Sequence, residues 1–160
     1  MASSADGTHL VAVVYDGGIY TSADSGVTRT EQTSAPVSVY WLSVASSLDG
    51  THLVAVVDGG GIYTSANSGV TWMEQTGAPT SAAWYSVASS ADGTHLVAVV
   101  YDGGIYTSAN SGVTWKEQTG APTANWQSVC NGVPAIHGDI QQCSSDAQSQ
   151  LIDFTQFDRL

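Results

Sequence analysis

Basic residues are scarce in this sequence. Three lysines and arginines (Arg29, Lys116 and Arg159) stand against 14 aspartates and glutamates, which gives a formal net charge of −11 at pH 7. Nucleic acids and anionic membrane surfaces are bound through clustered basic residues that neutralise phosphates. We therefore expect neither as a partner, and a neutral ligand or a divalent cation fits the charge better.

Cysteines and long apolar runs are scarce as well. The two cysteines, Cys130 and Cys143, both lie late in the chain, so most of it must fold without a disulfide, and whether the two pair is left open. No apolar run approaches the roughly 18 residues of a membrane-spanning helix, and the first residues lack the pattern of a signal peptide. These absences predict a soluble chain without membrane insertion and leave its compartment undetermined.

An internal repeat is the strongest feature that the sequence does contain. The string DGTHLVAVV begins at Asp6, Asp49 and Asp92, 43 residues apart each time. The second and third copies differ at only four positions between residues 44–80 and 87–123, which indicates recent duplication of one module. We expect a repeat region over residues 1–130 (units 1–43, 44–86 and 87–130), followed by a tail.

Each repeat predicts four short strands. In the third unit, residues 84–89, 95–101, 104–108 and 113–118 are rich in β-branched and aromatic residues, and Gly, Asn and Asp separate them. Four antiparallel strands in about 43 residues match one blade of a β-propeller. The run from Leu96 to Val100 is continuously apolar, so both faces of this strand should be buried between stacked blades.

The hairpin between the third and fourth strands carries the most specific motif. It reads SADSGVTR from Ser22, SANSGVTW from Ser65 and SANSGVTW from Ser108. These hairpins resemble the Asp box, SxDxGxTW, of sialidase-type (BNR) propellers, including sortilin-like and xyloglucanase-like ones. The resemblance implies that Asp accepts hydrogen bonds from the turn, Gly takes the left-handed position and Trp packs beneath the turn.

The resemblance implies a structural role for these residues, because in the family the hairpin lies away from catalytic pockets. Asn67 and Asn110 replace the Asp, and Arg29 replaces the first Trp. The structural residues implied are Ser22, Asp24, Gly26, Thr28, Ser65, Asn67, Gly69, Thr71, Trp72, Ser108, Asn110, Gly112, Thr114 and Trp115.

The number of blades is too small for a ring, since propellers typically have 4–8. Residues 125–129 resemble one more first strand, whereas the first unit lacks its own. We expect either a fragment of a longer array, which we favour, or a homodimer that closes a six-bladed ring. The tail, residues 131–160, is expected to be flexible or to form a short helix from Ser144.

Candidate sites are few. His9, His52 and His95 are equivalent positions in successive blades, too far apart to share a metal, and the aspartates fall in Asp-Gly turns, so we expect neither metal nor cofactor. Core packing is the role we expect for the five tryptophans, and an aromatic platform for a sugar is the alternative. The weak binding candidates are the three at the start of a first strand: Trp41, Trp84 and Trp126.

Catalysis is not expected. Sialidases hold the substrate carboxylate with three arginines, but this chain has two, and no phosphate loop or Ser/His/Asp order is evident. We predict a non-catalytic binding or scaffold module for a protein or glycan. The alternatives are a piece of an Asp-box glycoside hydrolase and a piece of a propeller like the photosystem II assembly factors, whose repeat pattern residues 84–115 resemble.

Overall fold

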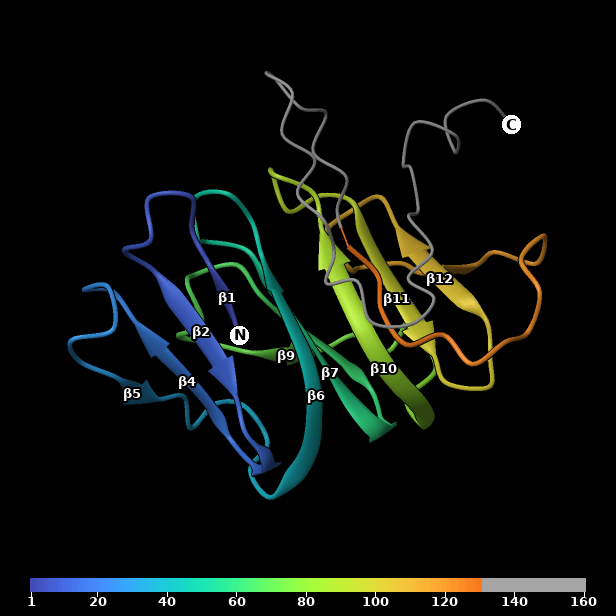
Figure 1. Ribbon diagram of the computed structural model, residues 1–160, viewed down its shortest axis with the longest axis horizontal. Coiled ribbons are helices and arrows are strands. Elements are labelled where there is room, and N and C mark those ends of the chain that lie inside the picture. The colour runs from blue at the N-terminus through green and yellow to red at the C-terminus, as the bar shows by residue number, and fades with distance from the viewer. Residues whose placement is uncertain (131–160) are drawn as a thin grey trace.

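The computed structural model describes residues 1–130, which form three four-stranded antiparallel propeller blades arranged side by side, the second and third joined by pairing into one larger sheet (Figure 1). Within the described residues every regular element is a strand. The predicted all-β class and partial propeller are confirmed. No helix in this part of the chain has the length and apolar character needed to cross a bilayer.

The three blades repeat one strand order. The strands of blade 1 are β1 (Ala2–Ser3), β2 (Leu10–Val13), β4 (Ile19–Ser22) and β5 (Thr30–Glu31). Those of blade 2 are β6 (Val39–Ser46), β7 (Leu53–Gly60), β8 (Ile62–Ser65) and β9 (Met73–Glu74). Those of blade 3 are β10 (Ala82–Ser89), β11 (Leu96–Val100), β12 (Ile105–Ser108) and β13 (Lys116–Glu117).

Neighbouring blades are joined by backbone pairing, which the sequence pattern did not indicate. β3 (Tyr15–Gly17) lies between β2 and β4 of blade 1 and pairs with the start of β6, and the end of β7 pairs with the start of β10. On the opposite end of the blades, the amide of Ala5 donates to Leu48 and the amide of Leu48 donates to Ala91. The blades are therefore tied to one another at both ends.

The fourth strands are shorter than the sequence predicts. β13 contains two residues, whereas the pattern indicated residues 113–118. Val113 and Thr114 belong to the preceding turn, where the amide of Thr114 donates to the side chain of Asn110. Because these two residues form part of the turn, the strand begins after them.

The core consists of layers between blades. Alternate residues of β7 point to opposite sides: Ala55 and Val57 pack toward blade 1, while Val54 and Val56 pack toward blade 3. The far side of blade 3 is covered by residues after β13, chiefly Val129 and Trp126.

The segment of residues 125–129 occupies the position of a further first strand. The amide of Val129 donates to Ser86 Oγ at 3.2 Å, as the amide of Val87 donates to Ser43 Oγ at 3.3 Å one blade earlier. This equivalence agrees with the sequence alignment of the segment with the start of β10. The expected tail helix and Cys143 lie outside the described residues.

Candidate functional site

The two ends of the blades differ in character. One end carries the turns that begin at Asp6, Asp49 and Asp92 together with the SxDxGxT hairpins, toward the top of Figure 1, and we call it the hairpin face. The other carries the turns between second and third strands and the linkers between blades, and we call it the loop face.

On the hairpin face, the first SxDxGxT hairpin satisfies its own polar groups. Asp24 accepts hydrogen bonds from the amide and hydroxyl of Thr28 at 2.8 and 2.6 Å, and Ser22 Oγ accepts from the amide of Gly26 at 2.8 Å. Ser25 and Gly26 take φ of 57° and 86°, the left-handed region that glycine favours. The Thr28 hydroxyl, the Thr28 amide and Ser22 together lower the pKa of Asp24 to about 2.

The other two hairpins reproduce this geometry with asparagine. Asn67 Oδ1 accepts from the amide of Thr71, and Asn67 Nδ2 donates to the Thr71 hydroxyl, both at 2.9 Å. Trp72 is buried between blades 1 and 2, whereas Arg29 at the equivalent position of blade 1 is exposed. Trp115 donates from its indole to the Gly112 carbonyl at 2.8 Å.

The Asp-Gly turns also use their carboxylates internally. Asp6 accepts from Ser4 Oγ at 2.6 Å and from the amide of Thr8 at 3.0 Å, and these bonds, that of Ser4 first, lower its pKa to about 2. The pKa values of Asp49 and Asp92 are lowered by equivalent bonds, first from Ser47 and Ser90 respectively. The carboxylates are therefore occupied in holding turns.

The histidines contact neighbouring blades. A Cβ on Gly50 would lie 2.7 Å from His9 Cβ, and one on Gly93 would lie 2.5 Å from His52 Cβ, so each imidazole packs over the glycine of the next turn. Within residues 1–130, no three His, Cys, Asp or Glu side chains are grouped so that they could hold a metal ion.

Two of the three tryptophans predicted as weak binding candidates are buried, which corrects that prediction. Trp41 is 1% exposed and Trp84 is 0% exposed, and their indoles donate to the carbonyls of Pro36 and Pro79. Neither can offer a ring face to a ligand in this structure, because each is wedged between blades. Trp126 is half-buried and donates to the Gly103 carbonyl at 3.1 Å, so it also serves packing.

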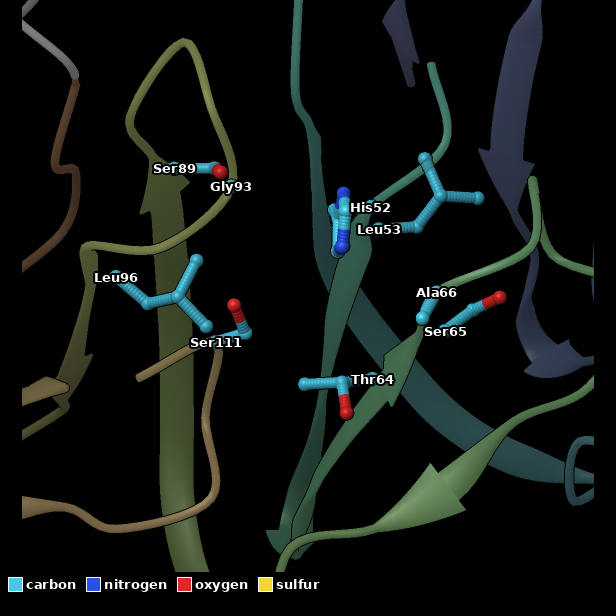
Figure 2. A pocket seen from close by; sticks show the side chains of 9 residues that line it. All are labelled: His52, Leu53, Thr64, Ser65, Ala66, Ser89, Gly93, Leu96 and Ser111. Carbon is cyan, nitrogen blue, oxygen red and sulfur yellow. The ribbon is translucent and has the colours of Figure 1, made fainter. Parts of the chain in front are cut away.

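A small cavity lies between blades 2 and 3 near the hairpin face (Figure 2). His52, Thr64 and Ser65 line one side of it, and Leu96 and Ser111 line the other. Its volume of about 40 Å³ is enough for a water molecule but far below the ~300 Å³ of small-molecule pockets. The matching cavity between blades 1 and 2 is smaller still, about 10 Å³.

A larger groove opens on the loop face of blade 2. It has a volume of about 320 Å³ and lies between the start of β6, the turn after β7 and the side chain of Glu74 on β9. Tyr40, Tyr63, Asp58 and Glu74 supply its functional groups, and glycines 59–61 form its floor. This groove, hereafter the loop-face groove, falls at the lower end of the size range of ligand sites.

Tyr63 and Glu74 are organised by their surroundings. The Tyr63 ring meets Trp41 edge to face, with centroids 5.2 Å apart, which fixes it against the core. Burial, with the charge and hydrogen bonding of Glu74, raises the pKa of Tyr63. Glu74 Oε1 lies 2.6 Å from where a Cβ on Gly61 would be, so the absence of a side chain there leaves room for the carboxylate.

Exposed tyrosines gather on the same face. Tyr40 is 48% exposed and stacks on Tyr15 of blade 1 with ring centroids 4.9 Å apart. Tyr85 and Tyr101 form a second, tilted pair at 5.8 Å. The loop face thus presents aromatic rings that the hairpin face keeps buried.

The loop-face groove depends on a local sequence difference between repeats. Blades 1 and 3 carry Tyr-Asp-Gly-Gly in the turn after the second strand, at Tyr15 and Tyr101, whereas blade 2 carries Asp58 followed by three glycines. Because Asp58 stands in place of a tyrosine, blade 2 has a smaller side chain with a carboxylate where the neighbouring blades have a ring. Two of the four differences between the second and third repeats therefore adjoin the groove, which was the signal available in the sequence.

The fold and its repeated inter-blade packing define a β-propeller protein, and solved structures agree. The chain is similar to YCF48 from Cyanidioschyzon merolae (TM-score 0.59, 21% identity, 73% of this chain and 35% of that one) and to YCF48 bound to D1 peptide (0.58, 18%, 73% and 39%). It is equally similar to the GH74 enzyme of Niastella koreensis (0.59, 20%, 78% and 18%). No protein-family model and no curated protein matches the sequence.

These similarities establish the fold. The chain spans about two fifths or less of the length of each of these structures. YCF48 and a GH74 enzyme match it equally well, so the backbone does not distinguish between them.

Proposed function

We propose that this chain is a non-catalytic β-propeller module that binds a protein or glycan partner through its loop face. The observation that carries the proposal is the loop-face groove of about 320 Å³, lined by tyrosines and carboxylates. Aromatic rings beside convergent polar groups are the usual lining of a recognition site.

The hairpin face is a weaker candidate because its polar groups serve the fold. Asp24 is held by Thr28, and Asp6 is held by Ser4 and Thr8. A ligand there would have to break these bonds, whereas Tyr40 and Asp58 are exposed along the loop-face groove.

A non-catalytic role is supported by what the groove offers chemically. Two carboxylates adjoin it, but Glu74 is engaged by Tyr63, and no histidine, lysine or arginine is among its lining residues. The three arginines of a sialidase pocket have no counterparts in the sequence.

A groove-filled variant tests the proposal. Asp58→Tyr with Gly59→Asp gives blade 2 the turn of blade 3, leaves the formal charge unchanged and uses a sequence that already folds twice in this chain. We expect partners captured from peptide and glycan arrays to be lost from this variant while its thermal unfolding is retained. Equal capture by both proteins, or robust glycoside hydrolysis by the purified chain, would overturn the proposal.

The glycoside hydrolase alternative has a distinct requirement. It is favoured by the likeness to the GH74 enzyme, which is as strong as the likeness to YCF48. Such an enzyme would need catalytic groups from outside the described blades. Measurable xyloglucan cleavage by a longer form of the protein, lost in the groove-filled variant, would favour this alternative.

Association of two copies into a six-bladed ring also stands as a proposal. The outer side of blade 1, with Leu10 and Ala12, is partly exposed, whereas the equivalent sides of blades 2 and 3 are covered by a neighbouring blade. Light scattering should then give a clean dimer mass that Ala12→Asp reduces to a monomer. A polydisperse or monomeric wild-type chain would count against the ring.

A further inference from the structure

We propose that the loop-face groove receives the cationic side chain, an arginine or lysine, of a partner polypeptide. This inference rests on the proposed function and names the chemistry of the partner. It depends on three observations: the groups that line the groove, the way one of them is held in place, and the difference between blade 2 and its neighbours.

The lining combines negative charge with aromatic rings. Asp58 and Glu74 are exposed carboxylates on the groove, and Tyr40 and Tyr63 contribute phenol rings beside them. A guanidinium or ammonium group is attracted by carboxylates and by the faces of aromatic rings. A neutral sugar could stack on the rings and donate its hydroxyls to the carboxylates, but it would not gain the charge attraction that two carboxylates offer to a cation.

One carboxylate is already positioned. Tyr63 is fixed by its edge contact with Trp41, and Glu74 lies beside the Tyr63 hydroxyl and over Gly61. A group held before binding loses less conformational freedom when the ligand arrives. The same Tyr–Glu–Gly arrangement recurs at Tyr106, Glu117 and Gly104, so it is a repeated feature of the blade.

Blade 2 differs by opening the site and by adding charge. At the equivalent positions blades 1 and 3 carry Tyr15 and Tyr101, whose rings pack on other tyrosines, Tyr101 beside Tyr85. In blade 2, Asp58 takes the place of that tyrosine and is followed by Gly59, whose φ is 69°. The groove beside this turn has a volume of about 320 Å³. This volume suits one long side chain with its flanking backbone rather than an extended polymer.

The charge of the whole chain favours the same partner. With 14 acidic and three basic residues, the protein attracts cations at long range and repels anionic partners. None of the lining residues is basic, so an incoming cation meets no competing charge in the groove itself.

The experiment compares two peptides on the full chain. Both are short Gly/Ser peptides; one has a central arginine and the other has citrulline, its neutral isostere, and binding is measured by calorimetry at low and high salt. We expect the arginine peptide to bind about tenfold or more tightly than the citrulline peptide, with an affinity that falls as salt rises. Equal binding of the two peptides overturns the cationic partner.

Three variants locate the site. The groove-filled variant, whose charge is unchanged, should lose about tenfold or more in affinity for the arginine peptide, and Glu74→Gln should lose about three- to tenfold. Asp102→Asn, on the same turn of blade 3 but outside the groove, is the control and should stay within about twofold because a distant exposed charge is screened. A loss in the control equal to that in Glu74→Gln would mean general attraction to an acidic surface and would overturn the site.

A neutral ligand separates this inference from the proposed function. Cellotetraose is titrated into the wild-type chain and the groove-filled variant. Sugar binding that the variant loses, without a preference for arginine over citrulline, overturns the cationic partner and keeps loop-face binding. If neither peptide nor sugar distinguishes the two proteins, both proposals fail.

Discussion

β2 of blade 1 and β7 of blade 2 begin with the same four residues, Leu-Val-Ala-Val, and a fifth, Val, comes next in both repeats, but the two copies lie in different environments. In β7, which lies between two blades, all five of these residues are buried. In β2, at the left of Figure 1, Val11 is buried while its neighbours in the strand are partly exposed, and the following Val14 is 45% exposed. An identical sequence is therefore core in one blade and surface in the other, so the stacked neighbours determine burial.

The largest expected effect comes from placing a charge in each copy of this strand. Ala55→Asp puts a carboxylate at a fully buried position between blades 1 and 2, and we expect it to cost about 4 kcal/mol or more, enough to unfold a marginally stable domain. Ala12→Asp is the matched change at a partly exposed position and should cost about 1 kcal/mol or less. Urea unfolding followed by circular dichroism measures both, and equal losses would contradict the comparison.

The next effect concerns the residue that ends the SxDxGxT hairpin. Trp72 is 6% exposed and packs between blades 1 and 2, so Trp72→Arg should cost about 3 kcal/mol through lost burial. Arg29 is the equivalent residue of blade 1 and is exposed, so the reciprocal Arg29→Trp should change stability by no more than about 0.5 kcal/mol. Thermal unfolding of the two variants is the measurement. A gain from Arg29→Trp as large as the loss from Trp72→Arg would show that blade 1 has a covering neighbour in solution.

This comparison also shows what the sequence could predict. The repeat spacing and the turn residues predicted the strands, the turns and the blade architecture, because each depends on local backbone chemistry. The continuous apolar run predicted burial on both faces, which holds for Leu96–Val99 and for the five residues from Leu53. It could not predict the difference between β2 and β7, since neighbours outside the strand cause it.

The candidate site was less accessible to prediction for a similar reason. For tryptophans at first-strand starts the sequence favours core packing and leaves a ligand platform as the alternative, and Trp41 and Trp84 do fill the space between blades. The loop-face groove arises from side chains that are missing at residues 58–61 and from tyrosines that come together from different strands. A missing side chain is not part of any recognisable motif. The only sequence signal for the groove is that residues 58–61 differ from the equivalent turns of the other two repeats.

Acid should weaken the described blades through their turn carboxylates. The folded pKa values of Asp6 and Asp24 are about 2, below the ordinary 3.8, so each stabilises the fold fully above pH ~4. This contribution is lost as pH falls from about 4 to 2, because protonation breaks bonds that the unfolded chain does not make. Melting midpoints measured across this range should decrease steadily, and a midpoint independent of pH would contradict the assignment.

The smallest expected effect tests whether the hairpins of blade 1 and blade 2 are interchangeable. Asp24→Asn gives blade 1 the residue that blades 2 and 3 use, and Asn67 shows that the amide can accept from the following threonine amide and donate to its hydroxyl. The variant should therefore melt slightly below the wild type at pH 7 and approach it at pH 2, because Asn does not titrate. Asp24→Ala, which removes both bonds, is the control and should melt lower than Asp24→Asn at pH 7. If Asn and Ala were equally harmful, charge rather than turn geometry would hold the first hairpin together.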